Sequence, residues 1–391
     1  MSQSVAWTAG VGDSGALFQE LAVVVDAAQG ARLRYRLYAT EPHLHVFTSV
    51  GPFADNSSST DAFLRLETGI ASAGGFLTDS QGLELHARQR WARPFTSQNY
   101  TGMAGNEPVA INSYPVTSGA VLADKDPARP ALAIITANSH SCTSMSDGAI
   151  ELGMNRNVLD KTGARFTGNR LVTQHNLLLL GVTATAATTA ARAAADELSN
   201  PPLAFAAVAA DVPGGGSPAF APLGQPLPPQ LSLVSLQLLP PALNLSAFFS
   251  DASGFAAAAA GGPPPPPAAA GMLLLRLRHM FQLGLDDAAL TAPVTVDLAA
   301  VFAPRWSVTA ATEMVVDGSG NMAAARAAQI QWQQQAGAGA ARGTQEVAPA
   351  AAAVAATTVA AKAAAHLPLR ASATSVTLAS MEIKTLLLTL A

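Results

Sequence analysis

Two adjacent pairs of acidic residues are the first candidates for chemistry in this chain. Two carboxyl groups held close together can act as an acid and a base or nucleophile. The pairs are Asp196-Glu197 and Asp286-Asp287. The first closes an alanine-rich stretch that predicts a helix, and the second lies in a predicted turn. We therefore expect both pairs to be solvated surface residues, and we predict no catalytic residue in this chain.

A pair of histidines could bind a metal ion. His43 and His45 stand two residues apart, and on a β-strand this spacing places both side chains on one face. A zinc site needs further ligands, such as a third histidine or a carboxylate. We identify no nearby residue that completes such a set, so we interpret the pair as part of a half-exposed strand and predict no metal site.

The single cysteine could provide a nucleophilic thiol. Cys142 cannot form an intrachain disulfide because the chain holds no second cysteine. A catalytic thiol needs a partner base and a lowered pKa, and His140 lies two residues away. Free cysteines are usually small buried residues, and we expect Cys142 to be one.

The composition argues against two classes of partner. Charged residues make up 12% of the 391 residues and the formal net charge is −4. No basic stripe stands out, so we expect no nucleic acid partner. Hydrophobic residues make up 49%, but many are alanine and no run of about 18 strongly apolar residues occurs, so we expect no membrane span.

Three glycosylation sequons and the N-terminus bear on localisation. The first seven residues lack a basic region followed by an apolar one, so we predict no signal peptide in this chain. Asn56, Asn99 and Asn244 each begin an Asn-x-Ser/Thr sequence and are candidate glycosylation sites, which favours a lumenal protein. The two observations agree if the chain is part of a longer protein with its signal upstream.

Short strand-like segments at regular spacing dominate the pattern. Residues 32–38 (RLRYRLY), for example, alternate with period two. We also expect one strand over residues 109–122 and a closing strand pair after residue 375. Many such segments, bounded by turn residues, predict a mostly β protein built from two β-sandwich domains. We place the first sandwich at residues 1–182 and a smaller one, which closes with the C-terminal strands, at residues 231–391.

The segments between and within these domains have a different composition. Residues 183–230 predict a helical and loop linker, with one helix over 183–198 that ends before the prolines at 201 and 202. Residues 252–270 and 335–365 are rich in alanine, proline or glycine. We interpret these two segments as low-complexity insertions.

Several motifs in the same order resemble one enzyme family. Residues 104–116 (AGNEPVAINSYPV) and 144–152 (SMSDGAIEL) are followed by 273–281 (LLLRLRHMF) and 380–386 (SMEIKTL). Residues 76–82 (FLTDSQG) precede them. Each resembles a segment from the C-terminal half of the lysosomal-type α-mannosidases, glycoside hydrolase family 38. The resemblance extends over residues 20–390.

The resemblance implies a fold, an activity and a partner. These enzymes are retaining glycosidases that remove α-linked mannose from N-glycans, and retention needs two carboxylates across the scissile bond. The family carries the aspartate nucleophile, the second acid and a bound zinc on an N-terminal domain, and none of those motifs occurs in this sequence. The C-terminal part, including a galactose-mutarotase-like sandwich, packs against that domain.

The resemblance also suggests site residues and a location. The tyrosine of the family's YYPV strand corresponds to Tyr114, which we predict at the rim of the sugar-binding pocket unless it is a core residue of the sandwich. Arg276, in an apolar strand, is a second rim candidate that would pair with a carboxylate of the catalytic domain. We expect no cofactor in this chain, zinc in the missing catalytic domain, and a lysosomal, vacuolar or secretory location.

Departures from the family keep other functions open. In residues 153–166 only one of two family arginines remains, Arg156, and an acidic pair is lost or shifted, which puts activity in doubt. The chain could instead be a stand-alone carbohydrate-binding or interaction module. Such modules stack sugars on aromatic residues, yet only four Trp and four Tyr occur. A decayed gene product without function is the third interpretation.

Overall fold

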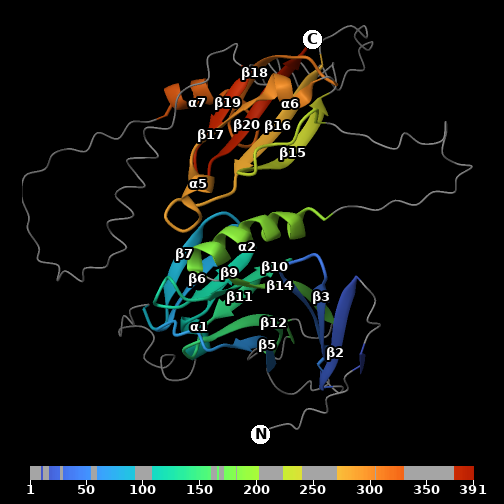
Figure 1. Ribbon diagram of the computed structural model, residues 1–391, viewed down its shortest axis with the longest axis vertical. Helices are drawn as coiled ribbons and strands as arrows, with labels where there is room; N and C mark the ends of the chain where they lie inside the picture. The colour runs from blue at the N-terminus through green and yellow to red at the C-terminus, as the bar shows by residue number, and fades with distance from the viewer. Residues whose placement is uncertain are drawn as a thin grey trace, which may run out of the picture. The chain divides into compact units, whose positions relative to one another are not determined.

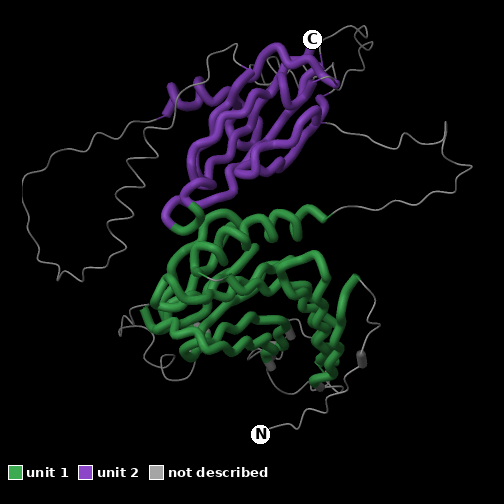
Figure 2. Tube along the Cα trace, in the orientation of Figure 1, with its two compact units in different colours: residues 1–203, 285–287 green, residues 204–284, 288–391 purple. Residues whose placement is uncertain are grey.

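The chain folds into two compact units. The first comprises residues 1–203 and 285–287, and the second comprises residues 204–284 and 288–391 (Figure 2). Their strands pair antiparallel throughout the described ladders. The computed structural model describes residues 10–11, 17–26, 30–53, 60–92, 108–159, 165–166, 171–181, 183–201, 223–239, 271–303, 305–329 and 374–391.

Unit 1 is built around a nine-stranded sheet (Figure 1). Strands that neighbour one another in sequence pair at both ends of the sheet, whereas its middle brings together segments more than a hundred residues apart. In spatial order the strands are β1 (Gly10–Val11), β2 (Phe18–Asp26), β3 (Ala31–Tyr38), β4 (Leu44–Val50), β14 (Val172–Gly181), β10 (Ala131–Thr136), β9 (Gly119–Ala123), β6 (Gly75–Asp79) and β7 (Leu85–Gln89).

A five-stranded sheet forms the second layer of unit 1. Its long central strand, β12, pairs with three others along its length. The short helix α1 (Pro108–Ile111) precedes the edge strand of this sheet. The strands are β13 (Arg165–Phe166), β12 (Ala149–Leu159), β5 (Thr60–Glu67), β11 (His140–Thr143) and β8 (Tyr114–Val116).

The main core of unit 1 lies between these two sheets. Because alternate residues of a strand face opposite sides, one face of each sheet supplies apolar side chains. Leu122 and Ile134 from the nine-stranded sheet pack in one cluster with Ile150 and Leu152 from β12, and all four are fully buried. This face-to-face packing is a β-sandwich.

Helix α2 (Ala184–Ser199) covers part of the other face of the nine-stranded sheet. Three buried alanines at helical spacing, Ala187, Ala191 and Ala194, let it approach closely. At Gly181 any Cβ would lie 2.6 Å from the amide nitrogen of Ala187, so the approach requires glycine. Thr183 caps the helix by accepting a hydrogen bond from the Ala186 amide. The helix predicted over 183–198 is confirmed.

Unit 2 is a smaller sandwich with its own core. A four-stranded sheet and a two-stranded sheet share one apolar cluster, in which Leu275, Leu386 and Phe302 are fully buried. The four-stranded sheet is β15 (Leu231–Leu239), β16 (Met272–His279), β20 (Ile383–Leu390) and β18 (Val308–Met314). The remaining elements are β17 (Val294–Asp297), β19 (Ser375–Leu378), α5 (Ala288–Thr291), α6 (Leu298–Phe302) and α7 (Met322–Ala327).

The mostly β fold class is confirmed, and two details differ from the prediction. The strand expected over residues 109–122 is α1 followed by two strands, β8 and β9, in different sheets. The closing strand pair expected after residue 375 is also split, because β19 pairs with β17 and β20 pairs with β16 and β18. The insertions at 252–270 and 335–365 lie outside the described residues.

No helix in the described ranges is long and apolar enough to cross a bilayer.

Candidate functional site

The two motifs that open the family resemblance lie on strands of one sheet. Tyr114, at the start of β8, is paired with Cys142 on β11. Cys142 is in turn paired with Leu152 on β12, at the end of the second motif. All three side chains belong to the core between the sheets of unit 1. The described apolar residues of these two motifs therefore contribute to packing in this chain.

The turn before β12 explains the residue types of the second motif. The Asp147 carboxylate accepts hydrogen bonds from the Ser72 hydroxyl (2.9 Å) and the Gly74 amide (3.3 Å). The bond from Ser72 is the main reason that the pKa of Asp147 lies below its usual range. Gly148 has φ of 71°, and a Cβ there would lie 2.6 Å from the carbonyl oxygen of Thr68. This motif holds two loops together.

Asp79 anchors a second turn, and the sequence did not single it out. Its fully buried carboxylate accepts hydrogen bonds from the amides of Gly82 (2.6 Å), Thr117 (2.9 Å), Ser118 (3.1 Å) and Gly119 (3.0 Å). These amides belong to the loop after β6, to the turn between β8 and β9, and to the first residue of β9. The signal was present as the Asp-x-x-Gly turn within residues 76–82.

Tyr114 lies in the core of unit 1. Tyr114 is 9% exposed. Its ring packs edge-on against the Phe76 ring with ring centres 5.7 Å apart, and the Arg88 guanidinium lies 4.7 Å from the centre of the tyrosine ring. These contacts are typical of a core tyrosine with a cation–π neighbour. The role of Tyr114 at a sugar-pocket rim stays a prediction.

Arg276 is partnered within unit 2. Its guanidinium donates hydrogen bonds to the carbonyl oxygens of Val316 (3.0 Å) and Asp317 (3.0 Å) and to the Ser235 hydroxyl (3.1 Å). Backbone carbonyls thus supply the acceptors for which a carboxylate of another domain was expected. Its role at the rim also stays a prediction.

The two acidic pairs differ from one another. Asp196 and Glu197 lie near the end of α2, and Glu197 is exposed as expected. The expectation is wrong for Asp286, which is buried and forms an ion pair with Arg192 of α2 at 3.3 Å. Its neighbour Asp287 is exposed. A carboxylate neutralised by a buried arginine has a structural role.

Cys142 is a buried free cysteine, as predicted. Burial is the main cause that raises the pKa of its thiol, and the nearby Glu151 adds to it. The His140 ring does not activate it, because the Nδ1 atom of His140 bonds the Gly153 carbonyl oxygen (2.9 Å). Burial lowers the pKa of His140. Neither residue has the properties of a catalytic pair.

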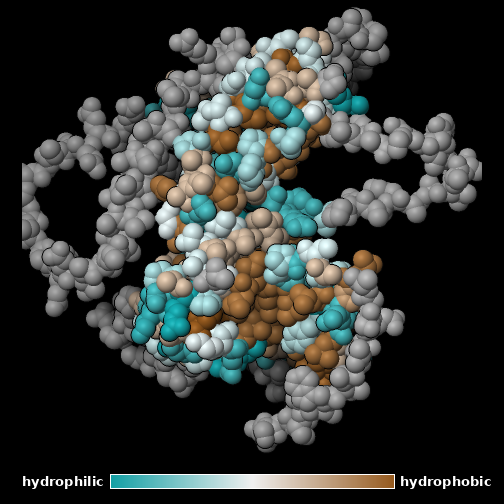
Figure 3. All heavy atoms as spheres, viewed as in Figure 1, coloured by the Kyte–Doolittle hydropathy of each residue, from teal (hydrophilic) through white to brown (hydrophobic). Residues whose placement is uncertain are grey.

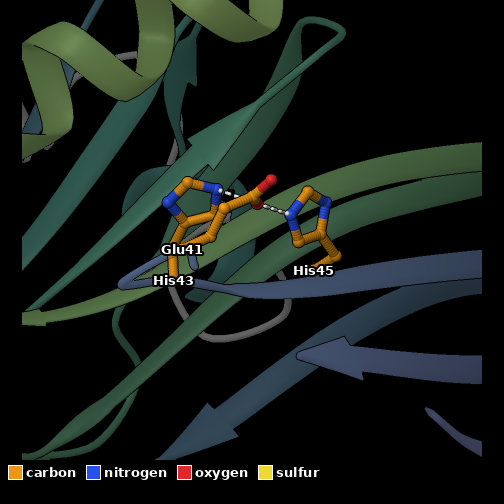
Figure 4. Close-up of side chains that lie close together, drawn as sticks. All are labelled: Glu41, His43 and His45. Carbon is orange, nitrogen blue, oxygen red and sulfur yellow. Dashed lines mark hydrogen bonds and ion pairs between the residues drawn. The ribbon is translucent and has the colours of Figure 1, made fainter. Parts of the chain in front are cut away.

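The histidine pair has the partners that the sequence analysis failed to identify. One carboxylate oxygen of Glu41 lies 2.9 Å from Nε2 of His43 and 2.5 Å from Nε2 of His45 (Figure 4). A third histidine, His175 on the neighbouring strand β14, places its Nε2 2.9 Å from Nδ1 of His45. The premise that neither a carboxylate nor a third histidine is near is therefore wrong.

His175 is held as a neutral imidazole. Burial is the main cause that lowers its pKa to about 4, and the nearby His45, His43 and Arg34 add to the effect. Its ring stacks on Phe47 with ring centres 4.3 Å apart and an angle of 11°. The stacked, neutral ring is a fixed hydrogen-bond partner for His45.

Of the remaining candidate residues, the structure describes Arg156 but not the three glycosylation sequons. The sequons at Asn56, Asn99 and Asn244 lie in ranges that the structure does not describe. In the segment that departs from the family, Arg156 forms an ion pair with Asp61 at 3.1 Å.

Comparison with known proteins finds a family model that matches the larger part of unit 1. Residues 4–163 match the family model "Glycosyl hydrolases family 38 C-terminal domain". The resemblance to family 38 drawn from the motifs is confirmed by this match.

Curated relatives agree with the family match. Lysosomal alpha-mannosidase of Cavia porcellus is 30% identical over 307 residues, which cover 76% of this chain and 27% of the relative. Lysosomal alpha-mannosidase of Homo sapiens is 31% identical over 276 residues, which cover 68% of this chain and 24% of the relative. The chain thus spans about a quarter of the length of these relatives.

A solved structure adds little. The alpha-galactosidase from Lactobacillus brevis covers 50% of this chain and 28% of its own, with 12% identity and a TM-score of 0.27. A TM-score this low does not establish a shared fold. The fold class rests on the strands described above.

Proposed function

We propose that this chain is the C-terminal part of an α-mannosidase that acts on N-glycan mannose, and that it supports a catalytic domain without hydrolysing glycosides itself. The observation that carries this proposal is the family 38 C-terminal match over residues 4–163 in a chain that spans 27% of its relative's length. The catalytic domain, in the same or a separate chain, would be its partner and would hold the zinc. By analogy with the relatives' names, we propose a lysosomal or secretory location.

The acidic residues support a non-catalytic role. Retaining glycosidases need two carboxyl groups about 5–5.5 Å apart, one on each side of the scissile bond. Of the adjacent pairs, Asp286 is neutralised by Arg192 and Glu197 stands exposed near the end of a helix. Asp79 and Asp147 are committed to loop amides and hydroxyls. None of these four carboxylates faces another across an open site.

An exposed apolar edge supports the bracing role. The nine-stranded sheet is wider than the five-stranded sheet packed on it, so its edge strands extend beyond the sandwich core. On β2 and β3 the side chains of Leu21, Val25 and Leu37 are exposed, Leu37 by 47%. Figure 3 shows apolar residues gathered on the face of unit 1 turned to the viewer. Clustered exposed apolar residues mark a surface that a partner covers.

The first test is hydrolysis of a chromogenic α-mannoside, with added zinc, at pH about 4.5 and 6.5, where paired carboxylates usually work. We expect no turnover by the purified chain, and turnover when a family 38 catalytic domain from the same genome is co-expressed with it. Turnover by the chain alone that a chelator abolishes would contradict the non-catalytic role.

A matched pair of variants tests the bracing surface. Leu37→Asp places a charge on the apolar edge and should reduce co-purification with the catalytic domain at least tenfold. Val234→Asp changes an exposed apolar residue of unit 2 and should leave it unchanged. Equal co-purification of both variants would rule out this edge as the bracing surface.

A further inference from the structure

We propose that Glu41, His43 and His45 form a binding site for a single zinc ion or a similar transition-metal ion. Two imidazoles and one carboxylate make a donor set that suits zinc, copper or nickel better than magnesium or calcium. The proposal concerns residues of this chain alone and does not depend on the proposed mannosidase role.

The three ligand atoms already converge. One ring nitrogen of His43, one of His45 and one carboxylate oxygen of Glu41 all lie within 4.8 Å of one another (Figure 4). In a tetrahedral zinc site with bonds of about 2.0–2.1 Å, ligand atoms lie about 3.3 Å apart. The carboxylate oxygen is now hydrogen-bonded at 2.9 and 2.5 Å from the two nitrogens. Movements of the ligand atoms by about 1 Å, through side-chain rotation, would make room for the ion.

The three ligands come from one short segment of chain. Glu41 and His43 lie in the bend that leads into β4, and His45 is the second residue of β4. His45 lies on β4, which is paired with β3 on one side and β14 on the other. His45, as a ligand on a strand inside the sheet, is therefore held more rigidly than a ligand on a loop.

Burial differs among the three ligands in a way that suits an accessible ion. The His43 side chain is 8% exposed and the Glu41 side chain 34%. The two histidine side chains are therefore the more buried ligands and the Glu41 carboxylate is the more exposed one. Three protein ligands leave a fourth position for water, as in zinc sites that exchange ligands.

His175 gives the site an outer-shell partner. When Nε2 of a histidine binds a metal, its Nδ1–H must donate a hydrogen bond, commonly to a fixed acceptor. Nδ1 of His45 faces Nε2 of His175 at 2.9 Å. The stack on Phe47 fixes the His175 ring. His175 is thus a positioning residue, which orients His45 without touching the ion.

The surrounding charges are compatible with a cation. Arg34 and Arg36 on the neighbouring strand would repel it, but Glu20 pairs with both, at 3.6 Å and 2.6 Å. The alternative is a hydrogen-bonded cluster in which the two histidines share the Glu41 carboxylate and no metal binds. That alternative and the metal site make different predictions for metal uptake.

The test measures zinc binding to the tag-free full chain by titration calorimetry and metal analysis after dialysis. We expect one equivalent of zinc and a raised Tm. Glu41→Gln and His43→Gln should each weaken binding at least tenfold, and His175→Gln by about 10–100-fold. His86→Gln, an exposed histidine on β7 of the same sheet, should leave the affinity unchanged.

Two outcomes would overturn the proposal. One is no zinc retained by the wild type at protein concentrations of tens of micromolar, which would leave the hydrogen-bonded cluster as the explanation. The other is retention that Glu41→Gln and His43→Gln do not change. If a variant fails to fold by circular dichroism, visible absorption of the cobalt-loaded wild type decides, since a band typical of four-coordinate cobalt is expected and its absence counts against the site.

Discussion

Replacing Asp79 by asparagine should destabilise unit 1 strongly although the two side chains have the same shape. The buried carboxylate accepts hydrogen bonds from four backbone amides and from the Ser118 hydroxyl. These donors join the loop after β6 to the turn between β8 and β9. The side chain therefore ties together segments about forty residues apart in the chain.

The size of the stability loss follows from the NH₂ group of asparagine, which cannot accept hydrogen bonds. If its NH₂ takes the place of Oδ2, the Gly82 amide loses its acceptor, and in the flipped orientation the Thr117 and Gly119 amides lose theirs. A buried orphaned donor costs about 1–3 kcal/mol. The remaining bonds lose their ionic acceptor, and charge-assisted bonds are roughly twice as strong as neutral ones. We expect Asp79→Asn to lower the free energy of unfolding by about 3 kcal/mol.

Urea unfolding at pH 7, followed by far-UV circular dichroism, measures this loss. With an m-value of about 2 kcal/mol/M, the midpoint of the unit 1 transition should fall by about 1.5 M. Asp61→Asn is the matched control, because Asp61 is half exposed and pairs only with exposed Arg156 among its described ion pairs. Such pairs contribute about 0–1 kcal/mol. A loss below about 1 kcal/mol in Asp79→Asn, or one equal to that of Asp61→Asn, would refute the reasoning.

Three further predictions concern buried residues. Tyr114→Ala should destabilise unit 1 by about 3–5 kcal/mol, as other buried aromatic truncations do, and a smaller urea-midpoint shift would count against a core role. The Cys142 thiol should resist a disulfide reagent in buffer and react fully in urea, and rapid reaction of the folded chain would contradict its burial and raised pKa. His140 and His279 have pKa values lowered by burial from 6.5, so below about pH 6.5 the unfolded chain binds more protons and stability falls. Urea midpoints at pH 7.5 and 5.5 measure this loss, and His279→Gln should reduce the difference between the two midpoints. If that difference is the same in the variant as in the wild type, His279 does not contribute.

The strand content and the helix were predictable because both depend on local patterns. Alternation in residues 32–38 corresponds to β3, and the alanine-rich run that ends before two prolines corresponds to α2. The motifs on β8 and β12 were sufficient to indicate the family. Each of these signals is contained within a short stretch of chain.

The histidine site shows what a linear pattern can and cannot reveal. Glu41 stands two residues before His43, so the same period-two argument that joined His43 to His45 could have included it. His175 could not have been found in this way. It meets His45 only because β14 pairs with β4 in one register, with Leu177 opposite His45. Register across 130 residues is a tertiary property.

Burial of polar residues was likewise hidden from the sequence. Asp286 looked like a surface residue because it stands in an acidic turn, yet Arg192 of α2 neutralises it. Arg276 seemed to need a carboxylate, whereas backbone carbonyls accept its hydrogen bonds. In both cases the partner lies at least forty residues away.

The position of β20 has a consequence for synthesis on the ribosome. This strand, Ile383–Leu390, lies between β16 and β18 in the four-stranded sheet, with Leu386 opposite Leu275. The sheets of unit 1, in contrast, need no strand after Gly181. A nascent chain can therefore complete the sheets of the first unit while the second still lacks a central strand. Until β20 has been synthesised, β16 and β18 each lack the strand that pairs with them, and such unpaired edges can associate with other chains.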